Sequence, residues 1–233
     1  MHYWIGAFCR NLKNDMRGIY FPSNVVAISD TITLVEDIGN NIPDRSWMLY
    51  LLEFFNSQKI PVELNLICQF DYKNYFEAIF NGINKYKFKN IMPIVGKSYS
   101  RVIINDKENL SIRYLLIDRL SSQSEEFNLK LNGSNNYNYD IQEQFTGIEW
   151  WNKTGYYPYK IRYKVQFSEI MFGIFDTNNK GITFNPYTSL IPDKDKLCNC
   201  YPISFKDIMI KSNNGIYYNV VPGICNNGIR FNS

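Results

Sequence analysis

The spacing of apolar residues changes near residue 90, and this change restricts the folds that are open to the chain. After that point apolar and polar residues tend to alternate, which is the period of a half-buried β-strand. Turn-forming residues such as Asn, Asp and Gly separate the alternating runs. The runs that predict strands are 91–95, 101–104, 110–116, 127–131, 161–167, 170–175 and 182–184. We therefore expect mainly sheet after residue 90.

The first residues carry a helical spacing. Trp4, Phe8 and Leu12 recur at i, i+4 and i+8, and Gly18 is placed to end a helix over 2–16. A short strand from Tyr3 to Phe8 is the alternative.

Two more segments before residue 90 favour helices. Asp44 or Ser46 can cap a helix that runs through 47–55. The segment 75–86 places Phe76, Ile79, Phe80 and Ile83 on one helical face. The stretches 24–36 and 62–70 are typical of strands. The last 40 residues are rich in loops, with short apolar pieces at 208–210, 216–218 and 220–221.

The predicted fold class is α+β. We expect a mostly antiparallel β-sandwich with an N-terminal helix and two or three further helices. The chain has 233 residues, which suits a single domain over 1–233. In that domain 1–16 is a projecting helix and 17–233 is the body.

Composition excludes several classes of protein. The net charge of +3 is too small to indicate nucleic acid or acidic lipid as a partner. No apolar run approaches the roughly 18 residues that a membrane helix needs. The five cysteines form an odd set without the spacing of secreted domains, and no signal peptide is evident, so we expect an intracellular protein.

Catalytic chemistry has little support in the sequence. His2 is the single histidine, which excludes Ser-His-Asp, Cys-His and multi-histidine metal sites. Cys198, Cys200 and Cys225 are one ligand short of a structural zinc site, and buried free thiols explain them better. Asp118 is the nearest approach to a carboxylate nuclease, with Asn128–Lys130 following and the second acid missing. We therefore predict a protein that is not an enzyme and requires no metal or cofactor.

Two basic ribbons alternate cations with apolar residues, at 85–89 and 160–165. An extended chain would place the cations on one face. Lys160, Arg162 and Lys164 are the candidates for binding an anion or a nucleotide, with the aromatics of 150–159 nearby for base stacking. The alternative is a solvated sheet face whose cations protect an edge strand.

Short segments in the last third of the chain match one family. They begin with Thr146-Gly147-Ile148-Glu149-Trp150, followed by a pair of strands between Tyr159 and Phe175. The later segments are Asn185-Pro186-Tyr187-Thr188, Pro222-Gly223-Ile224, Asn226-Asn227-Gly228 and Asn232-Ser233. Across 146–233 the chain resembles a cypovirus polyhedrin, the protein of insect-virus occlusion bodies.

The resemblance implies a non-enzymatic structural protein. Such polyhedrins form trimers that pack into a crystalline lattice in the cytoplasm of infected cells, embed virions and dissolve at alkaline pH. They use an N-terminal helix to link trimers, here the one with Trp4, Phe8 and Leu12, and they bind nucleotides in a structural role. The expected partners are thus further copies of the chain, virions and nucleotides, with no membrane.

Composition is compatible with this function. The 18 tyrosines are neutral at pH 7 and ionise near pH 10 when exposed. The alternative function is a monomeric module that binds nucleic acid or nucleotides through the two basic ribbons.

Overall fold

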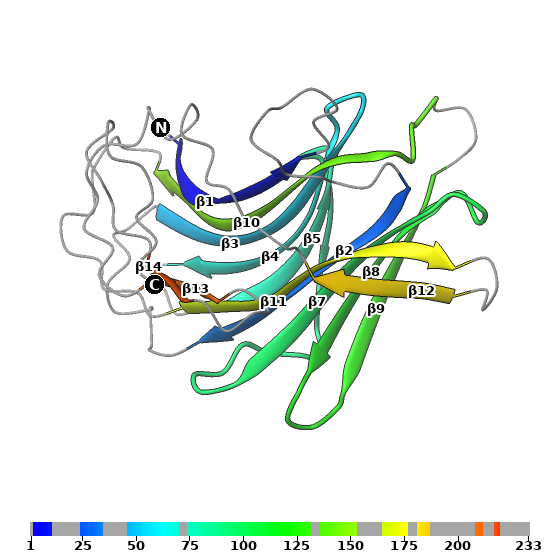
Figure 1. Ribbon diagram of the computed structural model, residues 1–233. Helices are drawn as coiled ribbons and strands as arrows, with labels where there is room; N and C mark the ends of the chain where they lie inside the picture. The colour runs from blue at the N-terminus through cyan, green and yellow to red at the C-terminus, as the bar shows by residue number, and fades with distance from the viewer. Residues whose placement is uncertain are drawn as a thin grey trace.

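The described part of the chain is built of strands. The computed structural model describes residues 2–10, 24–34, 46–69, 74–131, 136–152, 165–176, 181–186, 208–211 and 217–219. No helix occurs among these residues, and the strands β1 to β14 form two sheets that pack face to face (Figure 1). The α+β prediction is therefore wrong, because its helices are absent, whereas its β-sandwich is present.

One sheet has six strands in the order β1-β10-β3-β4-β5-β6, and all neighbours are antiparallel. Its strands are β1 (His2–Arg10), β3 (Ser46–Asn56), β4 (Pro61–Gln69), β5 (Tyr75–Phe80), β6 (Asn84–Lys87) and β10 (Ile141–Asn152).

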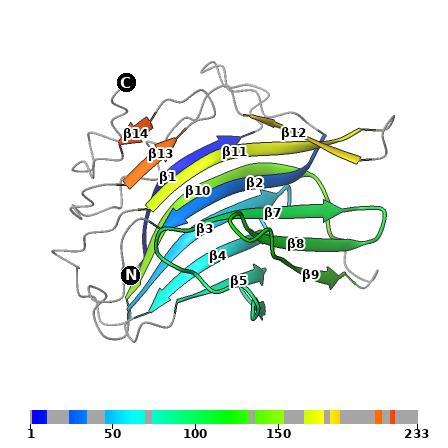
Figure 2. The ribbon, with the colours of Figure 1, turned by 90° about the horizontal axis from the view of Figure 1, so that it is seen from below.

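The other sheet has eight strands in the order β14-β13-β11-β2-β7-β8-β9, with β12 also paired to β11. Its strands are β2 (Val25–Leu34), β7 (Ser98–Asp106), β8 (Ser111–Asp118), β9 (Ser124–Lys130), β11 (Val165–Asp176), β12 (Gly181–Pro186), β13 (Ile208–Lys211) and β14 (Tyr217–Asn219). The β11–β13 pair is parallel and the other pairs are antiparallel. Seen from below, the strands of the eight-stranded sheet lie over those of the six-stranded sheet (Figure 2).

The core lies between the layers and is apolar, with a few large aromatic side chains. Strand β7 shows why the sequence folds this way, since its residues alternate between buried and half-buried along the whole strand. Leu52 and Leu64 of the six-stranded sheet share one buried cluster with Ile28 and Ile103 of the eight-stranded sheet. At roughly 1.5–3 kcal/mol for each large apolar side chain, this burial is the main force that holds the layers together.

One ion pair lies inside this apolar core. Arg101 on β7 and Asp30 on β2 are both fully buried side chains. The guanidinium donates to both carboxylate oxygens, with Nε at 2.8 Å from Oδ1 and an Nη nitrogen at 2.6 Å from Oδ2. This bidentate geometry is the strongest form of the pair.

The same guanidinium reaches across to the opposite sheet. It donates to the carbonyl oxygens of Tyr50 at 2.5 Å, Leu64 at 2.9 Å and Leu51 at 3.2 Å. The β3–β4 ladder is interrupted at this place: pairing stops at Tyr50–Leu66 and resumes in the same register at Glu53–Glu63. Arg101 thus uses all five of its N–H donors. Three of these hydrogen bonds go to carbonyl oxygens of β3 and β4 at the place where the ladder between the two strands is interrupted.

The N-terminal helix is the first correction. Residues 2–10 form β1, which pairs with β10 so that Trp4 lies opposite Glu149 and Phe8 opposite Phe145. The strand alternative from Tyr3 to Phe8 is the one that the structure adopts. An i, i+4 spacing also places residues on one side of a strand, so the pattern alone does not separate the two forms.

The helix expected at 47–55 is the second correction. This segment is β3, between β10 and β4. Tyr50 and Leu52 face the core, while Leu51 is also buried with Phe145 on the opposite face. Because the strand is buried on both faces, its apolar run does not alternate and resembles a buried helix.

The helix expected at 75–86 is the third correction, since this segment is a hairpin of β5 and β6. Asn81 and Gly82 have φ values of 53° and 67° and make the turn. Asn-Gly is the strongest short hairpin signal in a sequence, and the helical spacing had concealed it.

Most predicted strands are confirmed. They correspond to β2, β4, β7, β8, β9 and β12. The two strands expected at 161–167 and 170–175 are one strand in the described residues, β11, with a bulge at Glu169, whose φ is 50°. Strand β10 was not predicted, and the segment 91–95 is not a strand.

We expect Arg101→Met to lower the free energy of unfolding by about 3–5 kcal/mol, because the variant leaves the buried Asp30 carboxylate without a counter-charge. Urea denaturation followed by tryptophan fluorescence measures the change. In the double variant Arg101→Met/Asp30→Leu both charges are gone, so it should be more stable than Arg101→Met. A double variant that is less stable than the single one would contradict this account of the pair.

Candidate self-association site

Four exposed apolar side chains lie on two neighbouring segments at one end of the sandwich. Met92, Ile94 and Val95 belong to the connection between β6 and β7, and Leu120 belongs to the turn between β8 and β9. Their exposed fractions are 52%, 49%, 47% and 78%. We call these four residues the apolar tip. Both segments lie at the lower end of the molecule in Figure 1.

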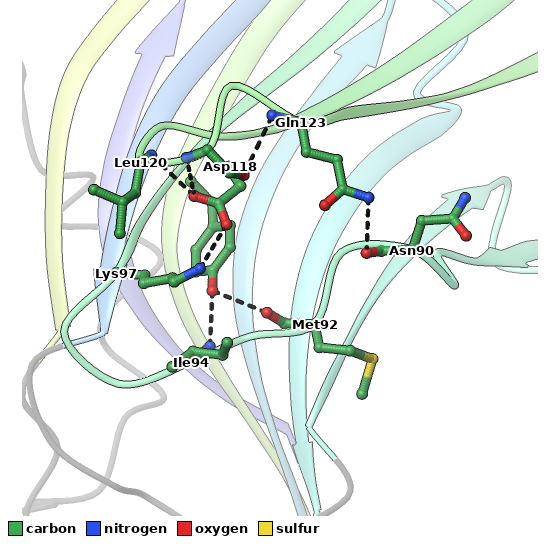
Figure 3. A network of polar contacts seen from close by, with 9 residues as sticks. Asn90, Met92, Ile94, Lys97, Asp118, Leu120 and Gln123 are labelled. Carbon is green, nitrogen blue, oxygen red and sulfur yellow. Dashed lines mark hydrogen bonds and ion pairs between the residues drawn. The ribbon is translucent and has the colours of Figure 1, made fainter.

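Tyr99 fixes the shape of the first segment. This buried residue is the second of β7, and its hydroxyl donates to the Met92 carbonyl at 2.9 Å. The same oxygen accepts the Ile94 N–H at 2.8 Å (Figure 3). Burial raises the pKa of the Tyr99 phenol, so it remains a donor at neutral pH.

Asp118 joins the two segments. Its Oδ2 accepts from Lys97 Nζ at 2.8 Å, and its Oδ1 accepts the backbone N–H groups of Leu120 at 2.9 Å and Ser121 at 3.3 Å. The Lys97 hydrogen bond is the main cause that lowers the pKa of Asp118 to about 2, and the same bond raises the pKa of Lys97. Figure 3 shows the Leu120 and Met92 side chains outside this polar network.

Glu125 holds the start of the first segment. Its carboxylate accepts the backbone N–H of Lys89 at 3.0 Å and of Asn90 at 2.7 Å. Gln123 donates to the Asn90 carbonyl at 3.3 Å (Figure 3). The tip therefore consists of apolar side chains on loops that polar contacts hold in place.

This arrangement suits association with another apolar surface. Exposed apolar residues that gather in one place mark interaction sites more often than single ones do. The acidic groups beneath the tip, Asp118 and Glu125, accept hydrogen bonds from Lys97 and from the backbone. The binding of an apolar partner would therefore not include the cost of desolvating a carboxylate that has no hydrogen-bond donor in the protein.

The nuclease alternative at Asp118 does not fit the structure. Asp118 ends β8 and pairs with Tyr99, whereas Lys130 pairs with Ser111 at the other end of β8. At about 3.3 Å per strand residue the two groups lie some 20 Å apart. Asp118 has a structural role at the turn.

Part of the first basic ribbon, 85–89, is a strand at the edge of the six-stranded sheet. Strand β6 is the last strand of its sheet, and its Lys85 and Lys87 are exposed, while Tyr86 is half-buried. Tyr86 stacks on Phe127 of β9 with ring centroids 4.2 Å apart, which brings the edges of the two sheets together. The alternative that the lysines protect an edge strand therefore describes this ribbon.

Several predicted sites fall outside the described residues. These are the anion-binding candidates Lys160, Arg162 and Lys164, together with Leu12 of the expected assembly helix. Cys198, Cys200 and Cys225, which we expect to be buried free thiols, also lie outside the described residues. Cys68 on β4 is buried in the core.

No group of three or more His, Cys, Asp or Glu side chains among the described residues could hold a metal ion. Over the same residues no helix is long and apolar enough to cross a membrane.

The apolar tip is not evident from the sequence, because the pattern of 91–95 predicts a strand there. Pro93 and Gly96 were the signals against that assignment, since proline cannot donate to a ladder and glycine often marks a turn. Gly96 has a φ of 84° in the turn before β7. Leu120 followed a predicted strand and carried no local signal.

No protein-family model matches the chain, and no curated protein matches it. Among solved structures, the chain is similar to scytalido-glutamic peptidase in complex with a transition state analogue inhibitor, with 12% identity and a TM-score of 0.45 over 83% of this chain and 81% of that chain. It is similar to tailspike protein 2 from Escherichia coli O157:H7 bacteriophage CAB120, with 7% identity and a TM-score of 0.41 over 67% and 21% of the two chains. A third is a Lotus tetragonolobus seed lectin, with 12% identity, a TM-score of 0.32, and 55% and 66% covered.

These similarities are too distant to transfer an activity. Peptidases are among the similar structures, so the expected absence of enzyme activity receives no support from them and stays a prediction. The resemblance to polyhedrins is likewise a prediction that the comparisons do not test.

We expect Asp118→Asn to lower stability at neutral pH, because the carboxylate then loses its ion pair with Lys97. The folded-state pKa lies near 2 instead of 3.8, so the contribution of the carboxylate is present above about pH 4 and disappears as the pH falls toward 2. Urea midpoints of the variant and the wild type, measured between about pH 7 and pH 2.5, should differ at neutral pH and converge in acid. Asp106→Asn, at the last residue of β7, is the control. A difference that persists in acid would show that the charge is not the cause.

Proposed function

We propose that this chain is a non-enzymatic structural protein whose copies bind one another through the apolar tip. The observation that carries the proposal is the set of four exposed apolar side chains on loops that Tyr99, Asp118 and Glu125 hold in place. The assembly we propose is an intracellular crystalline matrix of the occlusion-body kind, which embeds virions and dissolves at alkaline pH. The resemblance of residues 146–233 to polyhedrins supports this second part.

A second copy of the chain is the partner that best fits the tip. The described charged groups beneath the tip are compensated within the network, so two tips can approach without like charges facing each other. A symmetric contact needs only one self-complementary surface. The small net charge of +3 also permits dense packing of copies.

The correction at the N-terminus makes a different linking element necessary. Residues 2–10 are a strand within a sheet, so over these residues the chain cannot project as a linking helix. The apolar tip takes that role in our proposal.

Lys85 and Lys87 of the first basic ribbon do not support the alternative function, nucleotide binding. Lys85 Nζ lies 3.7 Å from Glu77, and Lys87 Nζ lies 3.8 Å from the centre of the Tyr75 ring. Both cations already have partners on the sheet.

We expect Leu120→Asp to weaken self-association at least tenfold. The variant removes the most exposed side chain of the tip and places a charge where two copies would meet. Static light scattering of the full chain at neutral pH, over a dilution series, measures the particle mass. The wild type should form particles much larger than one chain, while the variant should be smaller.

Ile83→Asp is the matched control, because Ile83 is 76% exposed in the turn at the far end of β6 from the tip segments. This variant should assemble like the wild type. A wild-type chain that stays monomeric, or equal losses in both variants, would contradict assembly through the tip.

We expect stability to fall at alkaline pH because of the buried tyrosines. Tyr114 is buried, and its hydroxyl donates to the Ile79 carbonyl of the opposite sheet at 3.2 Å. Burial is the largest cause that raises its pKa well above 10.0, followed by Tyr137 and Glu63 nearby. The unfolded phenol ionises near pH 10 while the folded one keeps its proton, so stability is full below pH 10 and decreases above it.

The expected slope is about 1.4 kcal/mol per pH unit for each such tyrosine. Urea denaturation between about pH 8 and pH 11.5 measures it, and Tyr114→Phe should make the decrease less steep. An identical slope in the variant would show that Tyr114 does not contribute to alkaline release.

A further inference from the structure

Strand β9 (Ser124–Lys130) ends the eight-stranded sheet on one side. It pairs with β8 along its whole length, and no strand of the described chain pairs with its other side (Figure 1). An edge strand of this kind presents unpaired backbone N–H and C=O groups, which are a template for another strand. What β9 can bind therefore depends on which of its groups point outward.

The hydrogen bonds at the two ends of the β8–β9 hairpin fix the direction of each backbone group. The Asp118 N–H donates to the Gln123 carbonyl at 2.9 Å, and the Leu131 N–H donates to the Leu110 carbonyl at 2.8 Å. Both pairs continue the register of the two strands. In an antiparallel ladder, bonded pairs alternate with pairs whose backbone groups point away from each other. The backbone groups that point away from β8 therefore belong to the even-numbered residues of β9, which are Ser124, Glu126, Asn128 and Lys130.

These outward backbone groups are accessible. The side chains of the same four residues are exposed, and no other segment of the described chain forms backbone hydrogen bonds with them. The strand contains no proline, and its pairing with β8 has no bulge. Proline and bulges are two of the devices with which proteins protect an edge, so β9 is open to a partner.

The edge of the other sheet is protected in a way that β9 is not. Strand β6 carries Lys85 and Lys87 on one face, and both are exposed. Pairing with a second copy of β6 would set lysine against lysine, which is unfavourable. Strand β9 carries both signs of charge on its outer face, as Glu126 and Lys130. It can therefore match a strand of the same sequence.

One register makes β9 complementary to its own copy. With Asn128 of both copies at the centre, antiparallel pairing places Glu126 opposite the second copy's Lys130 at both ends of the contact, which is a favourable cross-strand pair. On the inner face Phe127 then lies opposite the second copy's Leu129, and both are half-buried apolar side chains in the single chain. Centring the contact on Phe127 would pair neither charge with an opposite one. Centring it on Glu126 would set two carboxylates against each other.

The pairing does not require an unpaired carboxylate. Glu126 already accepts from Arg113 on β8, with Nε at 2.7 Å from Oε1 and an Nη nitrogen at 3.2 Å from Oε2. This contact holds the Glu126 side chain on the outer face, where it is still 38% exposed, and the second copy's lysine would join it as a further cation. The backbone groups supply the contact, and the charges select the register.

We propose that β9 pairs with β9 of a second copy of this chain, antiparallel and centred on Asn128, so that one sheet continues across both copies. This contact deepens the proposed function and rests on it for its role, because a symmetric contact between two tips joins only two copies. The edge gives each chain a second symmetric contact, with which the assembly extends beyond a pair.

Static light scattering of the full chain over a dilution series tests the edge contact in the Leu120→Asp background, where the tip contact is weakened. We expect the mass to rise to that of two chains and no further. Adding Asn128→Pro removes the outward N–H at the centre of the contact but no hydrogen bond to β8. The fold should therefore persist, which a thermal melt by circular dichroism checks, while dimerisation should weaken at least tenfold.

Charge variants in the same background test the register. Lys130→Glu sets carboxylates against each other at both ends of the contact, and Glu126→Lys sets lysines against each other. Each variant alone should dimerise at least tenfold more weakly, whereas an equal mixture of the two should regain the mass of two chains. Lys59→Glu, at an exposed lysine in the turn between β3 and β4 of the other sheet, should dimerise like the background.

Three results would overturn the proposal: a mass of one chain for the Leu120→Asp background throughout the series, an unchanged dimer in the folded Asn128→Pro variant, or a mixture of the charge variants that stays monomeric. The tip proposal fails separately, if Leu120→Asp leaves the wild-type particles unchanged. In that case the proline and charge variants decide the edge contact in the wild-type background.

Discussion

The alignment of the two sheets depends on the buried guanidinium of Arg101. Apolar burial supplies most of the favourable free energy, but it is not directional and would tolerate some sliding of one sheet over the other. Arg101 binds Asp30 within its own sheet and three carbonyl oxygens of the opposite one. A shift of one residue would leave buried donors and carbonyls without partners, which costs more than a slightly worse apolar contact.

The same strand also organises the candidate assembly site. Tyr99 and Arg101 are two residues apart on β7, so both side chains point toward the core. Arg101 fixes where β7 lies between the sheets, and Tyr99 fixes the segment that precedes β7. The position of Met92 and Ile94 at the tip is therefore tied, through one strand, to the packing of the core.

The proposed assembly surface depends on how the fold presents it. The apolar tip lies on loops, where side chains can project without disturbing a ladder. A loop site of this kind suits a contact between whole molecules.

The alternation after residue 90 was enough to predict β7, β8 and β9, because each has one face in the core and one face near solvent. The prediction was wrong for β3, which is buried on both faces and so lacks alternation. For β5 and β6 the turn signal of Asn81-Gly82 was present, but the helical spacing of Phe76 and Phe80 outweighed it. Among the residues of the candidate site, the sequence pointed only to Asp118, and it suggested a nuclease role there instead of the structural role that Asp118 has at the turn.

The sequence by itself determined that the chain is rich in strands with an apolar core, because side-chain alternation is a local property of the backbone. It also determined which residues carry charge and which are aromatic. Only the tertiary structure decided that 2–10 is a strand, since its partner β10 lies more than 130 residues away. It likewise decided that Arg101 is buried and that Leu120 and Met92 lie at one end of the sandwich. These outcomes depend on contacts between distant segments, which no local pattern encodes.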